Sequence, residues 1–463
     1  MNASKNIRFL VPIISLGIVL RVLSTHTYDF WFDEAYTYQI ANLPFPEFWE
    51  AALSDNNPPI YYLMIKAILQ KSQNELIIRF PSVIGGILTL VLVYKISKKL
   101  SSAKVARVAV ALCAVSPLLI YLSSEARPHS IAIFFSMLVV YVFLKLLEKP
   151  KSALFILISL LLTLGALVQY YILLLILPFS LIFLKRYRKF RVVWLLALSL
   201  PILTLAMWFF KSYEYYHTTC YCPNMPLSII YVLISPTVNM IGQITLGELL
   251  SKNSALFGLL MIPPAIFAFL FARAIFSSKL KLIYLIPFVF LSIISIKMPV
   301  FSPKAFAIFS PLFLIIASES LAKNSKILIT TLVFSMLIIT ILQISHHTFS
   351  GEKLKKAFSI TQKSGAPVFH NSVLSYYSFC FYAKSCSNQV LLGQNPLPKV
   401  QKDLFGGNQE QFRPKSKNIW LVDTLKWTNE NRRQKQIEKI FTSYFPIDKV
   451  YLDNLTIYSA IRR

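Results

Sequence analysis

The chain has 463 residues, of which 56% are hydrophobic and 14% are charged. Soluble domains contain about 25% charged residues, so a chain this long and this apolar cannot cover its surface with polar side chains. The formal net charge of +27 would indicate a nucleic-acid partner in a soluble protein. Here, however, the basic residues crowd into short connectors between apolar segments at alternate crossings, as the positive-inside rule describes. The composition therefore indicates a multipass α-helical membrane protein with no nucleic-acid partner.

The apolar segments define the expected topology. A spanning helix needs about 20 apolar residues, and helices in bundles tolerate about 17. On that basis we expect about eleven transmembrane helices, at residues 9–24, 79–96, 105–122, 129–147, 153–168, 170–185, 192–210, 255–273, 281–297, 304–321 and 327–344. The first has a basic start but no small-residue cleavage site, so we expect it to be retained with its N-terminus in the cytoplasm. An odd number of crossings then puts the C-terminus outside, and residues 227–250 are predicted to form a helix lying at the outer surface.

The first long loop, residues 24–78, holds seven of the twenty acidic residues, which indicates that it faces outward. It places Asp33 and Glu34 side by side among aromatic residues. A belt of interfacial aromatics explains the rings but not the acids. Adjacent helical residues point in different directions, so one carboxylate could act as a general base while the other organises a neighbouring loop or cation. The sequence supports equally well the plainer interpretation of two solvated loop acids.

Two further motifs place polar residues near the outer face. Asp55 shortly precedes Pro58 and Pro59, which fix an extended entry into a short apolar helix and could serve only as a structural turn. Glu125 and Arg127 follow the third predicted spanning segment. The plainer interpretation is an ion pair in which Glu125 and Arg127 compensate each other's charge. An arginine at the outer membrane face is also well placed to hold a lipid-linked phosphate.

From about residue 345 the hydrophobic runs become short and β-rich, and polar connectors separate them. This pattern predicts a small soluble α/β domain outside the membrane, over residues 345–463. Its short β-rich runs are 366–370, 418–422 and 449–458, and its expected helix is 430–441.

The cysteines fit an outward position of this domain. Cys380 and Cys386 are close enough in the sequence for a local disulfide, which an oxidising compartment would favour. Cys220 and Cys222 are expected in an outer loop, where so close a pair is hard to bridge and free thiols are the plainer interpretation. Cys113 is expected to be an inert residue inside a helix.

Four short motifs resemble those of the GT-C glycosyltransferases. They are Trp-Phe-Asp-Glu-Ala-Tyr at 31–36, Asn-Pro-Pro-Ile-Tyr-Tyr at 57–62, Ile-Arg-Phe-Pro-Ser at 78–82 and Glu-Ala-Arg-Pro at 125–128, in the order and spacing of that family. The similarity is to the family 39 and aminoarabinose-transferase-like group, which includes protein O-mannosyltransferases. Residues 298–306 resemble a late outer loop of the family that ends in Pro-Arg-Tyr. This chain has Lys304 in place of the arginine, which keeps the charge but lacks the bidentate fork, and Ala305 and Phe306 around the expected tyrosine.

The resemblance implies a GT-C-like transmembrane domain over residues 1–344 in the plasma (bacterial inner) membrane. It implies transfer of a sugar from a polyprenyl-phosphate donor to a lipid, glycan or protein acceptor at the outer face, with inversion at the anomeric carbon. By position, Asp33 would be the catalytic base, Glu34 would shape the donor site, and Arg127 and Lys304 would bind the phosphate.

Asp55 and Tyr61 complete the predicted donor- and acceptor-binding set. The histidines show no metal-ligand spacing, so no metal-binding residue is predicted. The resemblance leaves a divalent cation open, because metal-dependent and metal-independent members share this architecture.

Two other classes of function compete with this prediction. A multipass transporter or lipid-carrier flippase would concentrate ionisable residues and broken helices at the membrane midplane, often within internal repeats. Here the acids cluster in an outer loop and no repeat is visible. A noncatalytic scaffold for envelope polysaccharide assembly, with the soluble domain as its working part, is the third interpretation. Only 12 glycines occur, and no Gly-rich phosphate cradle of the Rossmann or P-loop kind is present.

Overall fold

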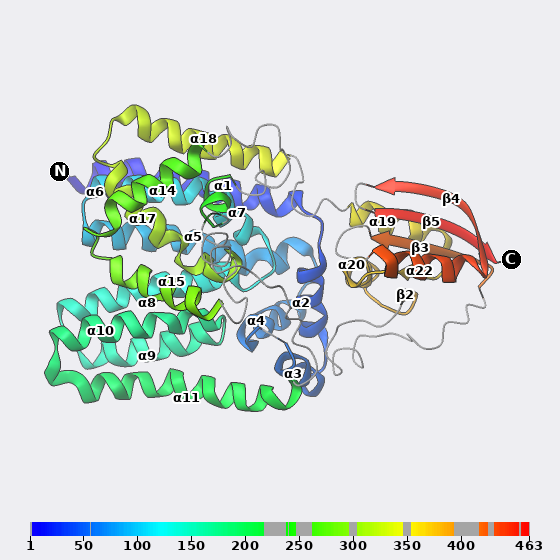
Figure 1. The fold of residues 1–463 in the computed structure, drawn as a ribbon, viewed down its shortest axis with the longest axis horizontal. Helices are drawn as coiled ribbons and strands as arrows, with labels where there is room; N and C mark the ends of the chain where they lie inside the picture. The colour runs from blue at the N-terminus through cyan, green and yellow to red at the C-terminus, as the bar shows by residue number, and fades with distance from the viewer. Residues whose placement is uncertain are drawn as a thin grey trace.

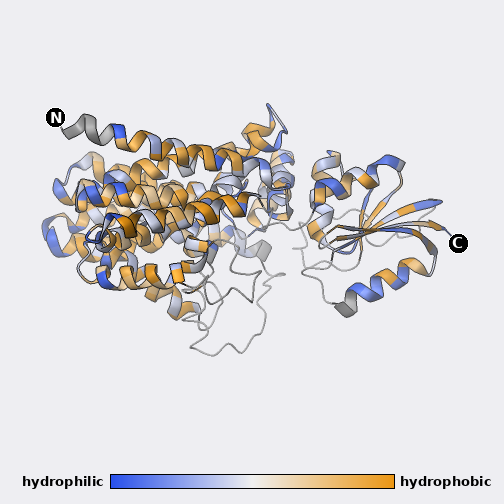
Figure 2. Ribbon diagram, turned by 90° about the horizontal axis from the view of Figure 1, so that it is seen from above, coloured by the Kyte–Doolittle hydropathy of each residue, from blue (hydrophilic) through white to orange (hydrophobic). Residues whose placement is uncertain are grey.

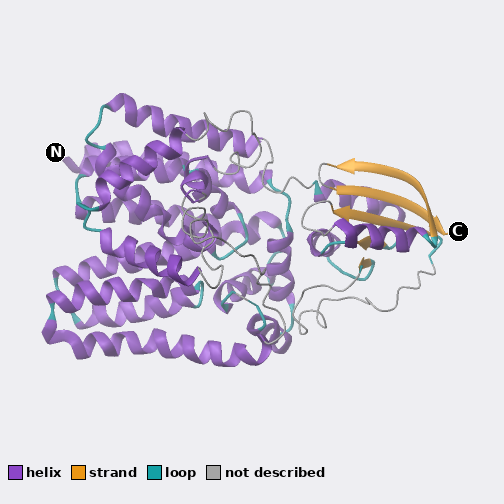
Figure 3. Ribbon diagram, viewed as in Figure 1, coloured by secondary structure: helices purple, strands orange, loops and turns teal. Residues whose placement is uncertain are grey.

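The computed structural model describes residues 2–55, 57–216, 238, 240–246, 262–295, 303–345, 353–392, 416–424, 430–452 and 455–462. Within them, a large bundle of helices is followed by a smaller part built on a β-sheet, and the two lie end to end along the long axis of the molecule (Figures 1 and 3). The predicted boundary between residues 344 and 345 falls at the end of the last bundle helix, and as a domain boundary it stays a prediction.

Helices of the bundle overlap every predicted spanning segment. In chain order they are α1 (Asn2–Thr27), α5 (Glu75–Leu100), α6 (Ala103–Val115), α7 (Pro117–Ser124), α8 (His129–Glu148), α9 (Ser152–Ala166), η1 (Tyr170–Leu175), α10 (Ile176–Arg186), η2 (Arg188–Phe190), α11 (Arg191–Tyr216), α14 (Ile262–Ile275), α15 (Lys281–Ser295), α16 (Pro303–Phe306), η4 (Ala307–Phe309), α17 (Ser310–Leu321) and α18 (Lys326–Ser345).

Among the described residues, 5 helices are long and apolar enough to cross a membrane alone, or up to 6 if the bent pair α6 and α7 is one span. The remaining apolar helices are shorter. The multipass helical architecture is therefore confirmed, and the number eleven stays a prediction. Of the surface helix expected over 227–250, only 238 and 240–246 are described, and these residues are helical. Cys220 and Cys222 lie outside the described residues.

Apolar side chains cover the outside of the bundle, as expected for helices that face lipid. Figure 2 shows hydrophobic residues along the lengths of the helices and hydrophilic ones concentrated at their ends. Helix α11 carries several large exposed side chains, among them Val192, Leu196 and Phe210, and Phe210 is 76% exposed. An apolar surface of this extent is incompatible with water and indicates burial in a bilayer.

A buried arginine holds the break between α6 and α7. The two helices meet at 55° around Ser116 and Pro117. Arg21, which is 1% exposed, donates to the carbonyl oxygens of Cys113 and Ala114 at 3.2 and 3.3 Å, and to Gly17 at 3.0 Å. Because the proline cannot continue the hydrogen bonding of α6, these carbonyls need another donor. Arg21 supplies it and so fixes the direction in which α7 leaves.

The predicted outer loop 24–78 folds into three short helices, α2 (Phe32–Asn42), α3 (Phe45–Leu53) and α4 (Pro59–Leu69). Helix α4 begins at Pro59, at a position where proline is preorganised for a helix and its missing N–H leaves no unmet bond. The short apolar helix predicted after the double proline is therefore confirmed. These helices lie at the end of the bundle that faces the sheet (Figure 1).

The C-terminal part is a five-stranded mixed sheet with the order β2-β1-β3-β5-β4. Its strands are β1 (Val368–His370), β2 (Gln389–Leu391), β3 (Asn418–Thr424), β4 (Tyr444–Leu452) and β5 (Leu455–Arg462), and its helices are α19 (Leu354–Thr361), η5 (Gln362–Ser364), α20 (Val373–Ala383) and α22 (Glu430–Phe441). The α/β composition and the helix over 430–441 are as predicted. The antiparallel strands β4 and β5 cover the β-rich run over 449–458.

Contacts tie this part to the bundle through α2 and α20. Phe30 stacks on Phe381 at a centroid distance of 3.9 Å, and its backbone N–H donates to Tyr382 at 2.8 Å. Lys355 pairs with Glu75 at 3.2 Å. A disulfide joins Cys380 and Cys386, as predicted, and Cys113 is a buried free thiol. The helices of the outer loop are thus held between the bundle and the sheet.

Candidate active site

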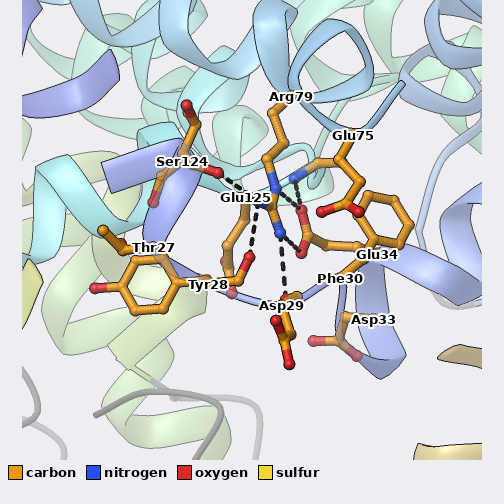
Figure 4. Close-up of polar contacts among 12 residues, drawn as sticks. Thr27, Tyr28, Asp29, Phe30, Asp33, Glu34, Glu75, Arg79, Ser124 and Glu125 are labelled. Carbon is orange, nitrogen blue, oxygen red and sulfur yellow. Dashed lines mark hydrogen bonds and ion pairs between the residues drawn. The ribbon is translucent and has the colours of Figure 1, made fainter. Parts of the chain in front are cut away.

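A buried ion pair between Glu34 and Arg79 organises the centre of the site (Figure 4). Both side chains are 1% exposed. Arg79 donates from Nε and Nη2 to the two carboxylate oxygens of Glu34 at 2.7 and 2.6 Å, and it also donates to the backbone carbonyls of Thr25, Tyr28 and Asp29. A bidentate pair with its remaining donors satisfied is the arrangement in which a buried charge pair is stable. It locks the end of α1 and the start of α2 onto α5.

The same carboxylate holds the loop between α7 and α8. Glu34 Oε1 accepts a hydrogen bond from the backbone N–H of Ala126 at 2.7 Å. Both oxygens of Glu34 are therefore engaged in contacts within the protein, and its side chain is buried. Of the two roles considered for the adjacent acids, the geometry matches the one that organises a neighbouring loop.

The side chain of Asp33 points in a different direction from that of Glu34. In Figure 4 its carboxylate is turned away from Arg79, as successive positions about 100° apart on a helix require. Its side chain is 26% exposed, against 1% for Glu34, so Asp33 is the accessible acid of the pair. It lies in the first turn of α2, where a negative charge is favoured by the helix dipole.

Lys304, which lies far from Asp33 in the sequence, brings a cation close to it. Its ammonium lies 3.8 Å from Asp33 Oδ2 and 3.6 Å from Glu125 Oε1, between the two acids. It donates to the Tyr121 hydroxyl at 3.5 Å and stands over the Trp31 ring at 4.8 Å. Aromatic faces stabilise a cation without neutralising it, so the ammonium keeps its charge for an anion.

Glu125 is a buried carboxylate, and neither oxygen has a hydrogen-bond partner among the described residues. Burial raises the pKa of Glu125 to about 8, although Lys304 acts in the opposite direction. At neutral pH its carboxyl group is therefore largely protonated. Lys304 and Asp33 therefore carry the opposite charges here, and Glu125 adds little negative charge beside them.

Arg127 lies on the other side of Asp33. It donates from Nη1 to the Asp33 carbonyl at 3.2 Å and to Thr37 Oγ1 at 3.0 Å, while its buried Nε has no partner among the described residues. Burial opposes its charge, yet the carboxylates of Asp33, Asp55 and Glu125 raise the pKa of Arg127, so it stays cationic. The self-compensating pair of Glu125 with Arg127 is not formed, because Glu125 pairs with Lys304 instead.

Asp55 and Tyr61 occupy supporting positions on the α3–α4 side. Asp55 Oδ2 accepts hydrogen bonds from the Tyr62 hydroxyl at 2.5 Å and from the backbone N–H of Asn57 at 3.0 Å. The buried Tyr61 hydroxyl contacts Ser82 Oγ at 3.0 Å, and Ser82 in turn donates to the Arg127 carbonyl at 3.1 Å. Tyr61 thereby supports the backbone that carries Arg127.

The structure thus brings Asp33, Lys304 and Arg127 together and sets Glu34 behind them as a buried support. Sequence reasoning gave Arg79 no role, although its position inside a mostly apolar helix was a signal, because an unpaired charge there is costly. It also treated Glu125 only as a partner of Arg127.

The residues present do not fit a divalent cation well. Among the described residues, no group of three or more His, Cys, Asp or Glu side chains could hold a metal ion. The two carboxylates that face each other here, Asp33 and Glu125, have the ammonium of Lys304 between them. A metal would have to displace that ammonium against like-charge repulsion.

The chain matches the family described as dolichyl-phosphate-mannose-protein mannosyltransferase over residues 56–210. Its structure resembles ArnT from Cupriavidus metallidurans bound to undecaprenyl phosphate, with a TM-score of 0.63, 12% identity and 97% of each chain covered. It also resembles the oligosaccharyltransferase AglB from Archaeoglobus fulgidus in complex with an inhibitory peptide and a dolichol-phosphate, with a TM-score of 0.50, 11% identity, and 98% of this chain and 74% of that chain covered. No curated protein matches the sequence. The resemblance to the GT-C glycosyltransferases is confirmed.

Proposed function

Starting from this GT-C family resemblance and fold, we propose that the protein is an integral-membrane glycosyltransferase that moves a sugar from a polyprenyl-phosphate donor to a hydroxyl-bearing acceptor at the outer membrane face. The acceptor is a lipid, a glycan or a protein. The observation that carries the proposal is the cluster of one accessible carboxylate, Asp33, with two cations: the Lys304 ammonium 3.8 Å from that carboxylate, and the Arg127 guanidinium, which donates to the Asp33 backbone carbonyl. The polyprenyl phosphate and dolichol phosphate bound by ArnT and AglB support a lipid-phosphate donor here.

In the proposed reaction Asp33 takes the proton of the acceptor hydroxyl as that oxygen bonds to the anomeric carbon. The bond between this carbon and the phosphate oxygen breaks in the same step, and the polyprenyl phosphate leaves with the electron pair. A single displacement of this kind inverts the anomeric centre. Lys304 and the free Nε of Arg127 stabilise the charge on the leaving phosphate. Positioning and electrostatics supply most of the rate enhancement, because a phosphate is a good leaving group once cations neutralise it.

The position of the cluster also bears on the competing transporter or flippase. Asp33 belongs to α2, and α2 packs against α20 of the C-terminal part at one end of the bundle. Transporter sites instead lie near the bilayer midplane. The disulfide between Cys380 and Cys386 supports an extracytoplasmic location of this end.

Replacement of Asp33 by asparagine tests the base. The substitution keeps the shape of the side chain but cannot accept the acceptor's proton at neutral pH. A positioned general base contributes about 10² to 10⁴ in rate, so turnover should fall at least about a hundredfold while donor affinity changes little. The assay incubates purified protein with a panel of polyprenyl-phosphate sugars and measures released lipid phosphate by mass spectrometry.

Asp29→Asn is the matched control, since Asp29 lies on the same loop but accepts a hydrogen bond from the Lys355 backbone at 3.1 Å. Its turnover should stay near wild type. Near wild-type transfer by Asp33→Asn would show that another group is the base, with Asp55 the next candidate. No transfer by the wild-type protein from any donor would favour the transporter or the scaffold.

A further inference from the structure

A second polar cavity lies at the opposite end of the bundle. It has a volume of about 410 Å³ and is formed where α5 ends, α6 begins, α14 turns into α15 and α17 ends. Four cationic side chains and one carboxylate line it, namely Lys104, Arg273, Lys279, Lys323 and Glu319. Figure 2 shows hydrophilic residues gathered at this end of the helices.

The cavity is remote from the candidate active site. Helix α5 runs from Glu75, which pairs with Lys355 of the C-terminal part, to Leu100, which lines the cavity. At 1.5 Å per residue, those 26 residues span about 38 Å, which exceeds the hydrocarbon thickness of a bilayer. The two sites therefore lie near opposite faces of the membrane, and this one lies on the side that the positive-inside rule assigns to the cytoplasm.

The lining is suited to an anion. The cations exceed the single carboxylate by three, and in the described part of the chain none of the four forms an ion pair of its own. The N-terminus of the 13-residue helix α6 adds the positive end of its dipole beside Lys104. The hydroxyls of Ser101 and Ser277 also line the cavity and can donate hydrogen bonds.

Exposed apolar side chains close to the lining residues in the chain point to a lipid. Phe276, directly before Ser277 in the turn between α14 and α15, is 77% exposed. Ile327, in the first turn of α18 shortly after Lys323, is 79% exposed. A basic pocket between spanning helices whose neighbouring residues are apolar and exposed matches the amphipathic character of a phospholipid. We propose that this cavity binds a phosphate-bearing anion at the membrane face opposite to the candidate active site, with an anionic phospholipid headgroup as the natural source.

The test measures lipid binding to the purified full-length protein by native mass spectrometry. The probes are phosphatidylglycerol, the zwitterionic phosphatidylcholine and inorganic phosphate. Phosphatidylglycerol should bind more tightly than phosphatidylcholine. A basic residue that faces an anionic headgroup contributes to the free energy of binding. Arg273→Gln should therefore weaken phosphatidylglycerol binding about fivefold, and the double variant with Lys104→Gln should weaken it about 25-fold.

Two further variants make the result independent of misfolding. Lys281→Gln removes an equal charge from the same turn region. Lys281 does not line the cavity, and its ammonium donates to the Phe276 carbonyl. This variant should therefore bind phosphatidylglycerol as the wild type does. Glu319→Gln removes the lining carboxylate and should tighten binding several-fold, which a damaged protein would not do.

The probes also separate the two sources of phosphate. Binding of phosphatidylglycerol that inorganic phosphate cannot displace assigns the site to a lipid headgroup. Displacement by inorganic phosphate assigns the same chemistry to a soluble phosphate-bearing molecule. Equal phosphatidylglycerol affinity in the wild type, Arg273→Gln and Glu319→Gln overturns the proposal.

Discussion

The buried ion pair between Glu34 and Arg79 predicts a large loss of stability when Glu34 is replaced by glutamine. The substitution keeps the size of the side chain but leaves the Arg79 guanidinium, 1% exposed, without its counter-charge. Breaking a buried pair on one side costs about 3–5 kcal/mol. Three carbonyl acceptors of Arg79 remain, from Thr25, Tyr28 and Asp29, so we expect the lower end of that range.

The expected loss is large enough to measure by thermal unfolding of the protein in detergent. If the 463 residues melt as a unit, with an unfolding entropy of about 2.1 cal/mol/K per residue, about 3 kcal/mol lowers the Tm by about 3 °C. Glu50→Gln, on the exposed surface of α3, makes the same chemical change without a buried partner and should leave the Tm unchanged. A double variant with Arg79→Met should recover much of the loss, because it removes the orphaned charge.

The same variant separates a supporting role of Glu34 from direct contact with the donor. A supporting role predicts that stability and turnover fall together, because the loop carrying Arg127 loses its anchor at the Ala126 N–H. A Glu34→Gln protein with the wild-type Tm and lost donor binding would refute this reasoning. Glu34 would then belong to the donor site, as its position in the family motif implies.

Two other substitutions test the surroundings of the site. Burial raises the pKa of Glu125 to about 8 from its ordinary value of 4.5, so the folded protein keeps a proton that the unfolded chain loses between these values. The stability of the wild-type protein should therefore fall with rising pH across that window, by up to about 1.4 kcal/mol per pH unit. Glu125→Gln should flatten the dependence of the Tm on pH. Parallel profiles of Tm against pH for the two proteins would contradict the raised pKa of Glu125. Gly86→Ala would place a methyl group 2.7 Å from Arg21 Nε and still closer to Ser123 Oγ, and the displacement of these two side chains should lower stability by about 1–3 kcal/mol in the same unfolding assay. An unchanged Tm would show that the close packing of α5 against Arg21 and Ser123 is not needed for stability.

Much of the fold follows from local properties of the sequence. Whether a segment is apolar enough for a bilayer depends on its own residues, and helices occur at each predicted segment, including the broken pair α6 and α7. The start of α4 at Pro59 and the helix over 430–441 are equally local, since proline geometry and helical periodicity act within a few residues. The β-rich run over 449–458 is local as well, although strand propensity marks β-structure without showing where β4 gives way to β5.

The division of roles in the site was decided by contacts between distant segments. The sequence placed two acids side by side, and helical geometry required that they diverge, but only the position of Arg79 on α5 decided that Glu34 is the buried one. Lys304 reaches Asp33 and Glu125 from a segment that is distant in the sequence, and this contact replaces the local pairing of Glu125 with Arg127. A buried charge takes whichever partner the packed helices bring within reach, because desolvation makes an unpaired charge costly wherever it lies in the chain. The sequence alone therefore determined which charges gather in the first long loop and at the helix ends, and the tertiary structure determined which of them support the fold and which remain accessible to a ligand.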